Sequence, residues 1–249
     1  MNGLYCEGLD KSFGGVLALK NVSLRFPTSG VIAIVGPNGA GKTSLVNVLT
    51  GFLKPDSGRY YFGHIEITNK LPYQIARLGI ARTFQDLRLI REVPVIDNVL
   101  LAISPHHGEY LFRSIISGSK SSEEIASRDK ALRTLRSVGL AEKAERLAGD
   151  LSYGQQKLLT LACCLASNAT IMFFDEPVAG VYPALASSIL ALMRQFKNDG
   201  KLVVFIEHDM ASVRAVADSV IVMDQGSIIA EGSPQDVLQR PATLEAFLR

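Results

Sequence analysis

Short runs of apolar and β-branched residues recur along the chain, and each ends at a polar or turn-forming residue. Such runs predict buried strands, here over residues 22–26, 31–35, 80–84, 171–174, 202–206 and 220–223. Apolar residues spaced about 3.6 apart predict helices, here over residues 44–53, 152–167 and 183–197. Because strands and helices alternate, the pattern indicates an α/β fold whose parallel sheet is covered on both faces.

The stretch between residues 85 and 151 has a different pattern. It shows helical periodicity over 95–103 and 123–138 and contains no convincing strand. We therefore expect a helical lobe inserted into the sheet domain.

The composition narrows the class of protein. Hydrophobic residues make up 47% of the 249 residues and the mean hydropathy is +0.20, yet no apolar run approaches the roughly 18 residues that a membrane-spanning helix needs. The 26 Lys and Arg residues nearly balance the 24 Asp and Glu residues, which favours neither nucleic acid nor another strongly charged partner. Fibrous, disordered and integral-membrane proteins are excluded.

The cysteines and the N-terminus indicate the compartment. Cys6, Cys163 and Cys164 lack metal-ligand spacing, and the first ten residues contain neither the basic nor the apolar region of a signal peptide. We expect small buried thiols and a protein that stays in the cytoplasm.

Residues 36–43 read GPNGAGKT, a full match to the phosphate-binding loop pattern G-x-x-x-x-G-K-[ST]. The segment lies between the predicted strand 31–35 and the predicted helix 44–53, as that motif requires. Its glycines let the backbone turn tightly and point N–H groups inward, and the helix N-terminus adds partial positive charge. Lys42 can reach the terminal phosphates, and Thr43 presents a hydroxyl to Mg²⁺. The candidate ATP-binding residues here are Gly36, Pro37, Asn38, Gly39, Ala40, Gly41, Lys42, Thr43 and Ser44.

An acidic pair follows the predicted strand 171–174. Asp175 and Glu176 stand at the carboxyl end of that strand, which is the edge where open α/β sheets bind ligands. Asp175 would hold Mg²⁺ through water, and Glu176 would orient or deprotonate the attacking water. Together with the phosphate loop, the pair predicts an ATPase that uses ATP and Mg²⁺.

Four further features accompany these motifs. LSYGQ at 151–155 precedes a helix, Gln85 and His208 each follow a predicted strand, and Phe13 lies upstream of the phosphate loop. Together they resemble the nucleotide-binding subunit of ATP-binding-cassette (ABC) transporters over the whole chain. More narrowly, four segments resemble the ATP-binding subunit of branched-chain amino-acid importers. They are GIARTFQ (79–85), LSYGQQ (151–156), EPVAG (176–180) and IEHDM (206–210).

The resemblance implies a more detailed fold and a division of the chain. It implies an α/β fold made of a P-loop NTPase (RecA-like) core, an antiparallel β subdomain and an inserted α-helical subdomain. The nucleotide-binding core would comprise residues 1–85 and 161–249, and the helical lobe with its signature motif would comprise residues 86–160.

The resemblance also implies roles for single residues. Phe13 would stack on adenine, Gln85 would complete the Mg²⁺ or water site and connect it to the helical lobe, and His208 would contact the γ-phosphate. The implied catalytic residues are Glu176, His208 and Lys42, and the implied metal-site residues are Thr43, Gln85 and Asp175.

The signature motif is expected to act on another molecule. Ser152 is predicted to be a helix N-cap, so that its hydroxyl and the following N–H groups face an anion. By resemblance, Ser152, Gly154 and Gln155 close over ATP bound to a second subunit, and two sites form between head-to-tail cassettes. Hydrolysis by an isolated monomer should therefore be slow.

Two places depart from the commoner family pattern. Tyr153 stands where most signatures have a glycine, although tyrosine is typical of the amino-acid importers. AGVY at 179–182 stands where many members have a serine and an aspartate, so Tyr182 lacks the carboxylate of a loop that crosses the dimer interface in relatives.

The implied function is that of an ATP-hydrolysing motor subunit. It would power the import of branched-chain or related amino acids through separate transmembrane permease subunits and pair with a second nucleotide-binding subunit, identical or different. It would lie peripherally on the cytoplasmic face of the inner (cell) membrane. A substrate-binding protein would be only an indirect partner, and no nucleic acid partner is expected.

Three alternatives stay open. The transporter could carry urea, amides or an exported lipid; the chain could be a soluble cassette ATPase acting on DNA or in iron–sulfur assembly; or it could be a non-hydrolysing regulatory partner. DNA-repair relatives carry long coiled-coil insertions, whereas residues 86–150 contain no sustained heptads. The presence of Lys42, Asp175, Glu176 and His208 disfavours the non-hydrolysing alternative.

Overall fold

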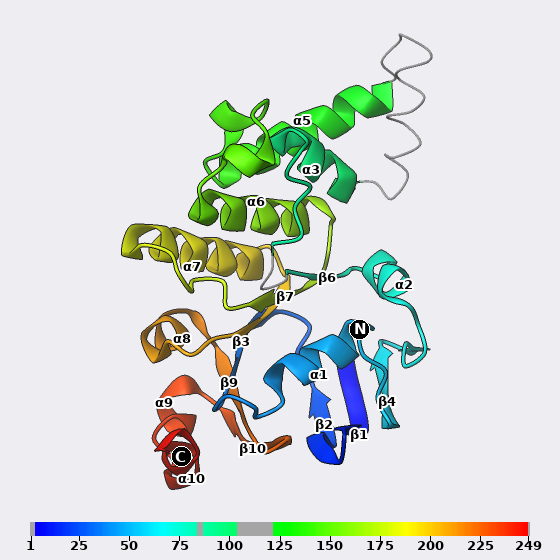
Figure 1. Ribbon diagram of the computed structural model, residues 1–249, viewed down its shortest axis with the longest axis vertical. Helices are drawn as coiled ribbons and strands as arrows, with labels where there is room; N and C mark the ends of the chain where they lie inside the picture. The colour runs from blue at the N-terminus through cyan, green and yellow to red at the C-terminus, as the bar shows by residue number, and fades with distance from the viewer. Residues whose placement is uncertain (1–2, 84–86, 104–121, 249) are drawn as a thin grey trace. The chain divides into compact units, whose positions relative to one another are not determined.

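The computed structural model describes residues 3–83, 87–103 and 122–248, and Figure 1 shows its helices and strands. The chain forms two compact units. The first, called the core unit below, comprises Met1–Arg82, Thr170–Ala179 and Ala186–Arg249. The second, called the helical unit, comprises Thr83–Ala169 and Gly180–Leu185.

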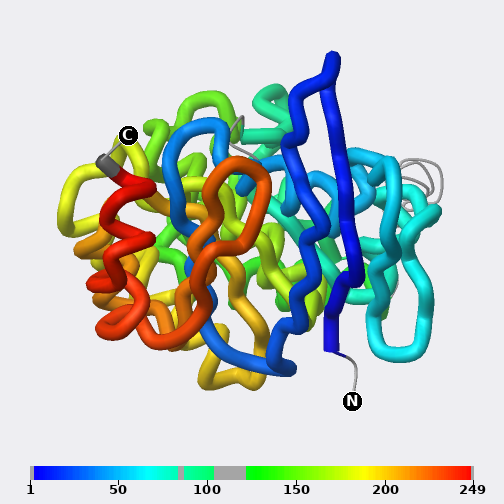
Figure 2. The backbone as a smooth tube through the Cα atoms, turned by 90° about the horizontal axis from the view of Figure 1, so that it is seen from below, coloured from blue at the N-terminus to red at the C-terminus, as the bar shows by residue number. Residues whose placement is uncertain are grey.

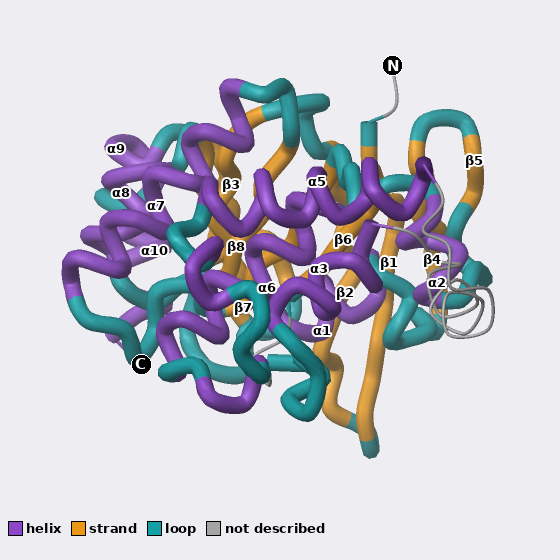
Figure 3. The backbone as a smooth tube through the Cα atoms, turned by 90° about the horizontal axis from the view of Figure 1, so that it is seen from above, coloured by secondary structure: helices purple, strands orange, loops and turns teal. Residues whose placement is uncertain are grey.

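A six-stranded sheet runs through the core unit in the order β10-β9-β3-β8-β7-β6, and Figure 3 shows its strands in orange. Strand β3 pairs in parallel with β8 and β9, and β7 pairs in parallel with β6 and β8. Every side chain of β3 and β8 is buried. The predicted parallel sheet is confirmed for five of these strands: β3 (Gly30–Val35), β6 (Ile80–Arg82), β7 (Ile171–Asp175), β8 (Leu202–Ile206) and β9 (Ser219–Asp224). The sixth strand, β10 (Ser227–Gly232), was not predicted and pairs antiparallel with β9.

A second sheet of the core unit is antiparallel and has the order β2-β1-β4-β5. Its strands are β1 (Leu4–Phe13), β2 (Val16–Arg25), β4 (Ser57–Phe62) and β5 (Ile65–Glu66), and Figure 2 shows β1 and β2 side by side as a hairpin. The hydrophobic pattern predicts only residues 22–26 of this sheet, at the end of β2. The rest was missed because these strands expose one face, so that polar residues interrupt their apolar positions.

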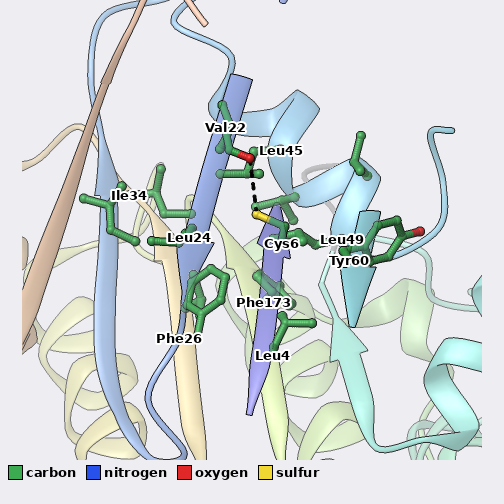
Figure 4. Packing of buried hydrophobic residues seen from close by; sticks show 14 of the residues in the cluster. Leu4, Cys6, Val22, Leu24, Phe26, Ile34, Leu45, Leu49, Tyr60 and Phe173 are labelled. Atoms are coloured by element: carbon green, nitrogen blue, oxygen red, sulfur yellow. Dashed lines mark hydrogen bonds between the residues drawn. The ribbon is translucent and has the colours of Figure 1, made fainter. Parts of the chain in front are cut away.

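The antiparallel sheet packs on the helix that follows the phosphate loop, α1 (Lys42–Leu49). Figure 4 shows Leu4 and Leu24 from the sheet in one cluster with Leu45 and Leu49 from α1. Cys6 lies in this cluster and its thiol donates to the carbonyl of Val22 at 3.7 Å. Burial raises the pKa of Cys6 to about 12, so it is a neutral buried thiol, as its sequence context predicts.

In the described part of the helical unit, α3 (Val95–Ile103), α5 (Ser122–Ser137) and α6 (Tyr153–Ala166) each pack against the other two. Short 3₁₀ turns follow α5 at Ala141–Lys143 and Ala148–Asp150. Within the described residues of this unit, the β-pairing is limited to one isolated bridge between Pro94 and Leu147. The helical character predicted for this stretch is confirmed.

Two predicted elements have different bounds in the structure. The helix predicted over 44–53 is α1, which begins at Lys42 and ends at Leu49, because Gly51 turns the chain with φ of 77°. The strand predicted over 80–84 ends at Arg82, and Phe84 lies outside the described residues. The remaining helices are α2 (Pro72–Arg77), α7 (Pro183–Asn198), α8 (Met210–Val216), α9 (Pro234–Val237) and α10 (Pro241–Leu248).

Within residues 3–83, 87–103 and 122–248, no helix has both the length and the apolar character that crossing a membrane requires.

A buried ion pair connects β6, β7 and α1. The Arg82 guanidinium lies 3.3 Å from the Asp175 carboxylate, and the two side chains are only 5% and 7% exposed. Arg82 also donates to the side chains of Asn47 in α1 and Thr50 at its C-terminal end. Burial raises the pKa of Asp175, and the Arg82 cation opposes this rise. Arg82 therefore gives the buried Asp175 carboxyl group a counter-charge.

Replacing Arg82 with methionine should lower the free energy of unfolding by about 3 kcal/mol near neutral pH, because the buried carboxylate loses its counter-charge. The pKa of Asp175 should then rise further above its unfolded value, so the folded protein would bind more protons than the unfolded chain. Stability should therefore recover relative to the wild type as the pH falls from neutral towards the unfolded carboxyl pKa of about 4. Urea unfolding at several pH values measures both effects.

Arg59→Met provides the matched control. Arg59 lies 3.9 Å from Glu66 in an exposed ion pair, whose loss should lower the free energy of unfolding far less, because water and salt screen exposed charges. The role given to the buried pair would be contradicted if R82M and R59M lowered the free energy of unfolding equally. It would also be contradicted if the stability of R82M did not recover relative to the wild type at low pH.

Candidate active site

Three neighbouring strands of the six-stranded sheet end at the same edge. In the parallel register, Ile34 of β3 and Asp175 of β7 both lie beside Ile206 of β8. The phosphate loop therefore leaves β3 at the level where Glu176 leaves β7 and His208 follows β8. Carboxyl ends of parallel strands are where α/β sheets bind ligands, so the sheet brings these three segments to one candidate site.

The phosphate loop fits closely between two other backbone segments. Gly36 has φ of 148°, and a Cβ atom there would lie 2.1 Å from the carbonyl oxygen of Met223. Gly41 has φ of 99°, and a Cβ atom there would lie 2.3 Å from the carbonyl oxygen of Ala18. Only glycine fits either position without displacing backbone, which explains two of the motif's glycines physically.

Lys42 opens α1 and is buried. Its ammonium group donates to the carbonyl oxygens of Gly36 at 2.7 Å and Pro37 at 2.8 Å. Burial lowers the pKa of Lys42, and the negative charges of Glu176 and Asp175 oppose this shift. The cation and both carboxylates thus share one electrostatic environment.

Glu176 has an unusual backbone conformation at the end of β7. Its φ of 47° lies in the left-handed region that non-glycine residues rarely adopt. The backbone N–H donates to the carbonyl of Ile206 at 3.0 Å, and the carboxylate Oε1 lies 3.0 Å from Nε2 of His208. The side chains of Glu176 and His208 are 26% and 42% exposed, so the pair is reachable from solvent.

Phe13 stands at the tip of the β1–β2 hairpin. It is 51% exposed, and the Lys11 ammonium lies 5.6 Å from the centre of its ring. Val16 and Leu17 beside it are exposed as well. An exposed aromatic ring of this kind offers a face on which a planar base can stack.

The signature segment begins α6 in the helical unit. Ser152 is the N-cap predicted from the sequence: its hydroxyl accepts from the N–H of Gln155 at 3.4 Å, and the Gln155 side chain accepts from the N–H of Ser152 at 3.2 Å. A Cβ atom on Gly154 would lie 2.3 Å from Leu185 Cδ2, so a larger residue here would need the Leu185 side chain to move. Ser152 and Tyr153 are both exposed.

The predicted site residues thus fall into three groups. Phe13, the phosphate loop, Asp175, Glu176 and His208 belong to the core unit. Ser152, Gly154 and Gln155 belong to the helical unit. Gln85 lies outside the described residues.

Two charged residues at this sheet edge received no role in the sequence analysis. Arg82 pairs with Asp175, and Glu207 accepts hydrogen bonds from the backbone of Val178 and His208. Both stand at the end of an otherwise apolar strand. A charged residue at the end of an apolar strand is the feature that could have pointed to Arg82 and Glu207. The hydrophobic pattern, however, does not show which neighbouring strand or loop supplies the group that each of them contacts.

The donor chemistry near the phosphate loop fits Mg²⁺. Within the described part of the chain, no three His, Cys, Asp or Glu side chains cluster as they would around a protein-only metal site. Mg²⁺ does not need such a cluster, because it is typically held by one or two carboxylates, water and the phosphates of a substrate. The Thr43 hydroxyl and the Asp175 carboxylate supply the hard oxygen ligands that this ion prefers.

Comparison with known proteins assigns this site to a family. A family model for ABC transporters matches residues 19–179. The probable branched-chain amino acid transport ATP-binding protein LivG of Archaeoglobus fulgidus is 37% identical over 248 residues, covering 100% of this chain and 96% of the relative. The high-affinity branched-chain amino acid transport ATP-binding protein LivG of Escherichia coli K12 is 36% identical over 98% of this chain and 97% of its own length.

Solved structures agree with these sequence relatives. The ADP conformation of an ATP-binding cassette of an ABC transporter superimposes with a TM-score of 0.83 at 35% identity, over 100% of this chain and 99% of that chain. A dimeric post-hydrolysis cassette bound to ADP and Pi superimposes with a TM-score of 0.77 at 28% identity, over 93% and 98% of the two chains. With its phosphate loop, acidic strand end and cassette fold, this chain belongs to the ATPase subunits of the ABC transporter family.

Proposed function

We propose that this chain is the ATP-hydrolysing motor subunit of an importer for branched-chain or related amino acids. The observation that carries the proposal is the meeting of the phosphate loop, Asp175 and the Glu176–His208 pair at one sheet edge. The cargo class rests on the importer subunits that this chain resembles over nearly its full length.

The phosphate loop would bind the triphosphate of ATP. Its backbone N–H groups and the N-terminus of α1 favour an anion, and Lys42 would transfer its hydrogen bonds from the loop carbonyls to phosphate oxygens. Thr43, Asp175 and Gln85 are the proposed residues that hold Mg²⁺. When bound, Mg²⁺ would supply positive charge that offsets the negative charge of the phosphates. The exposed ring of Phe13 would stack on adenine.

Glu176 is the proposed general base. Its carboxylate would take a proton from water as the water oxygen bonds to the γ-phosphorus, and the bond between that phosphorus and the β–γ bridging oxygen breaks. ADP and inorganic phosphate are the products. His208 would donate a hydrogen bond to the γ-phosphate, and its 3.0 Å contact with Glu176 would keep the two groups aligned.

The site would be completed by a second subunit. Ser152, Gly154 and Gln155 would contact ATP bound to the partner's phosphate loop, where the capped N-terminus of α6 favours an anion. The partner would be an identical or a related cassette, and separate permease subunits would hold the pair peripherally at the cytoplasmic face of the membrane. Residues 1–85 and 161–249 would act as the nucleotide-binding core, and residues 86–160 would act as the lobe that faces the permease.

Replacing Glu176 with glutamine should leave ATP binding intact and lower turnover at least about 100-fold, because the variant loses the general base but keeps its shape. ATP-bound dimers should accumulate. Turnover assays and size-exclusion chromatography with ATP measure the two effects.

Glu231→Gln is the matched control, because Glu231 is an exposed glutamate of β10 in the same unit. It should keep wild-type turnover. Undiminished hydrolysis in E176Q would remove Glu176 from the role of base.

Mixing two inactive variants tests whether the signature acts on the partner's ATP. Lys42→Ala damages the phosphate loop and Ser152→Ala damages the signature, so each variant alone should be nearly inactive. In a homodimer, equal mixing should restore about one quarter of wild-type activity, because half of the dimers then contain one site built from two intact halves. No recovery in mixtures that do form mixed dimers would place both groups in the same subunit's site.

The permease partners can be tested directly. When the full-length protein is captured from membranes, mass spectrometry should find multi-spanning permease subunits and a cassette partner. Capture of soluble proteins alone would contradict the transporter assignment.

The cargo can be tested by uptake. Cells that lack this chain should take up leucine, isoleucine and valine more slowly, and the wild type but not E176Q should restore uptake. Urea and acetamide uptake should not change. A loss of urea or amide uptake instead would overturn the amino-acid assignment while leaving the motor function intact.

A further inference from the structure

Glu207 is a buried acidic residue directly after β8. Its side chain is only 3% exposed, and none of the ion pairs found among the described residues includes it. Its carboxylate instead accepts from backbone N–H groups: Oε1 from Val178 at 3.2 Å, and Oε2 from His208 at 3.0 Å and Asp209 at 3.4 Å. A carboxylate is costly to bury, and these charge-assisted hydrogen bonds compensate for its lost hydration.

The donors come from two loops that carry the proposed catalytic groups. Val178 belongs to the loop after β7, two positions beyond Glu176, whereas His208 and Asp209 belong to the loop after β8. Glu207 therefore joins the backbones of these two loops. The contact between Glu176 and His208 joins the same loops through their side chains.

Together these contacts form a closed ring. The chain runs from Glu176 to Val178, the Glu207 carboxylate bridges to the next loop, and His208 returns to Glu176 through the 3.0 Å contact. The left-handed conformation of Glu176 is unfavourable for an L-residue and persists only where surrounding contacts hold it. Glu207 supplies such a contact from within the protein.

A neutral amide could not make the same contacts. A glutamine side chain has one acceptor oxygen and one donor nitrogen, and here both carboxylate oxygens face N–H groups. A glutamine side chain could therefore accept a hydrogen bond from one loop, but its NH₂ group would face the N–H donor of the other loop. Its shape is almost unchanged, which makes it a sensitive probe of the bridge.

We propose that Glu207 is a positioning residue for ATP hydrolysis, which fixes the loop of Glu176 relative to the loop of His208 so that both groups face the γ-phosphate together. Glu207 does not touch the nucleotide and acts through the backbone of the two loops. The inference rests on the proposed function, because it takes Glu176 and His208 as the groups that act on ATP.

Glu207→Gln in the full-length protein is the direct test. Turnover per nucleotide-binding site should fall at least about 10-fold, since misalignment of a positioned base lowers kcat. The KM for ATP and the affinity for a fluorescent ATP analogue should stay within about twofold, because the phosphate loop is unchanged. Turnover is divided by the number of molecules that bind nucleotide, so that a partly unfolded sample does not appear as a lower kcat.

Glu231→Gln again provides the exposed control, and Glu207→Asp provides a second variant if E207Q does not fold. Aspartate keeps the charge but is one methylene shorter, so it should lose the bridge to Val178 and lower kcat in the same direction. Normal kcat in a folded variant that lacks the bridge would overturn the proposal and leave Glu207 a structural residue.

A double variant tests the route of the effect. If Glu207 acts by aligning His208, E207Q should lower kcat much less in a His208→Ala background than in the wild type. Equal fold-changes in the two backgrounds would overturn that route. The E176Q result separates the two levels: an active E176Q removes Glu176 from the proposed role of base, on which this inference rests, whereas an inactive E176Q with a normal E207Q defeats only this inference.

Discussion

The chemistry of this chain depends on the parallel register of three buried strands. Strands β3, β8 and β7 are neighbours, and their pairing places Ile34, Ile206 and Asp175 at one level. Each strand is apolar until it reaches the sheet edge, and each then continues into a functional segment. A shift of one residue in either pairing would separate the phosphate loop from the acidic strand end and would turn buried side chains towards the opposite face. The hydrophobic core therefore brings the three segments to one level of the sheet edge, and local contacts between their loops then hold the proposed catalytic groups.

Charge at the edge of an apolar sheet creates a second constraint. Lys42, Asp175 and Glu207 are all largely buried, and each has lost much of its hydration. The structure compensates each one differently: loop carbonyls accept from Lys42, Arg82 pairs with Asp175, and backbone N–H groups donate to Glu207. These partners also fix where each charge lies. The contacts that replace the lost hydration of these charges are thus the same contacts that hold the charges in place before a ligand binds.

The two compact units divide the work of an ABC ATPase. The core unit contains the phosphate loop and the proposed hydrolytic pair, while the helical unit presents the capped N-terminus of α6 with Ser152 at its start. In the helical unit, a capping box between Ser152 and Gln155 orders the start of this helix. One bacterial ABC transporter cassette that this chain resembles was solved as a dimer, which is consistent with the proposal that this segment acts on a partner's ATP.

The sequence by itself determined the parallel sheet, the helical insertion and the phosphate loop, because apolar runs, helical periodicity and a contiguous motif are local signals. The hydrophobic pattern missed most strands of the antiparallel sheet, which keep one exposed face, and it misplaced the end of α1. The family resemblance, in contrast, implied the antiparallel subdomain that the structure contains. Only the tertiary structure showed that Arg82 meets Asp175 and that Glu207 joins the loops of Glu176 and His208. These partners come from different strands, so sheet register decides their contacts, and register is set by packing across the whole core rather than by neighbouring residues in the chain.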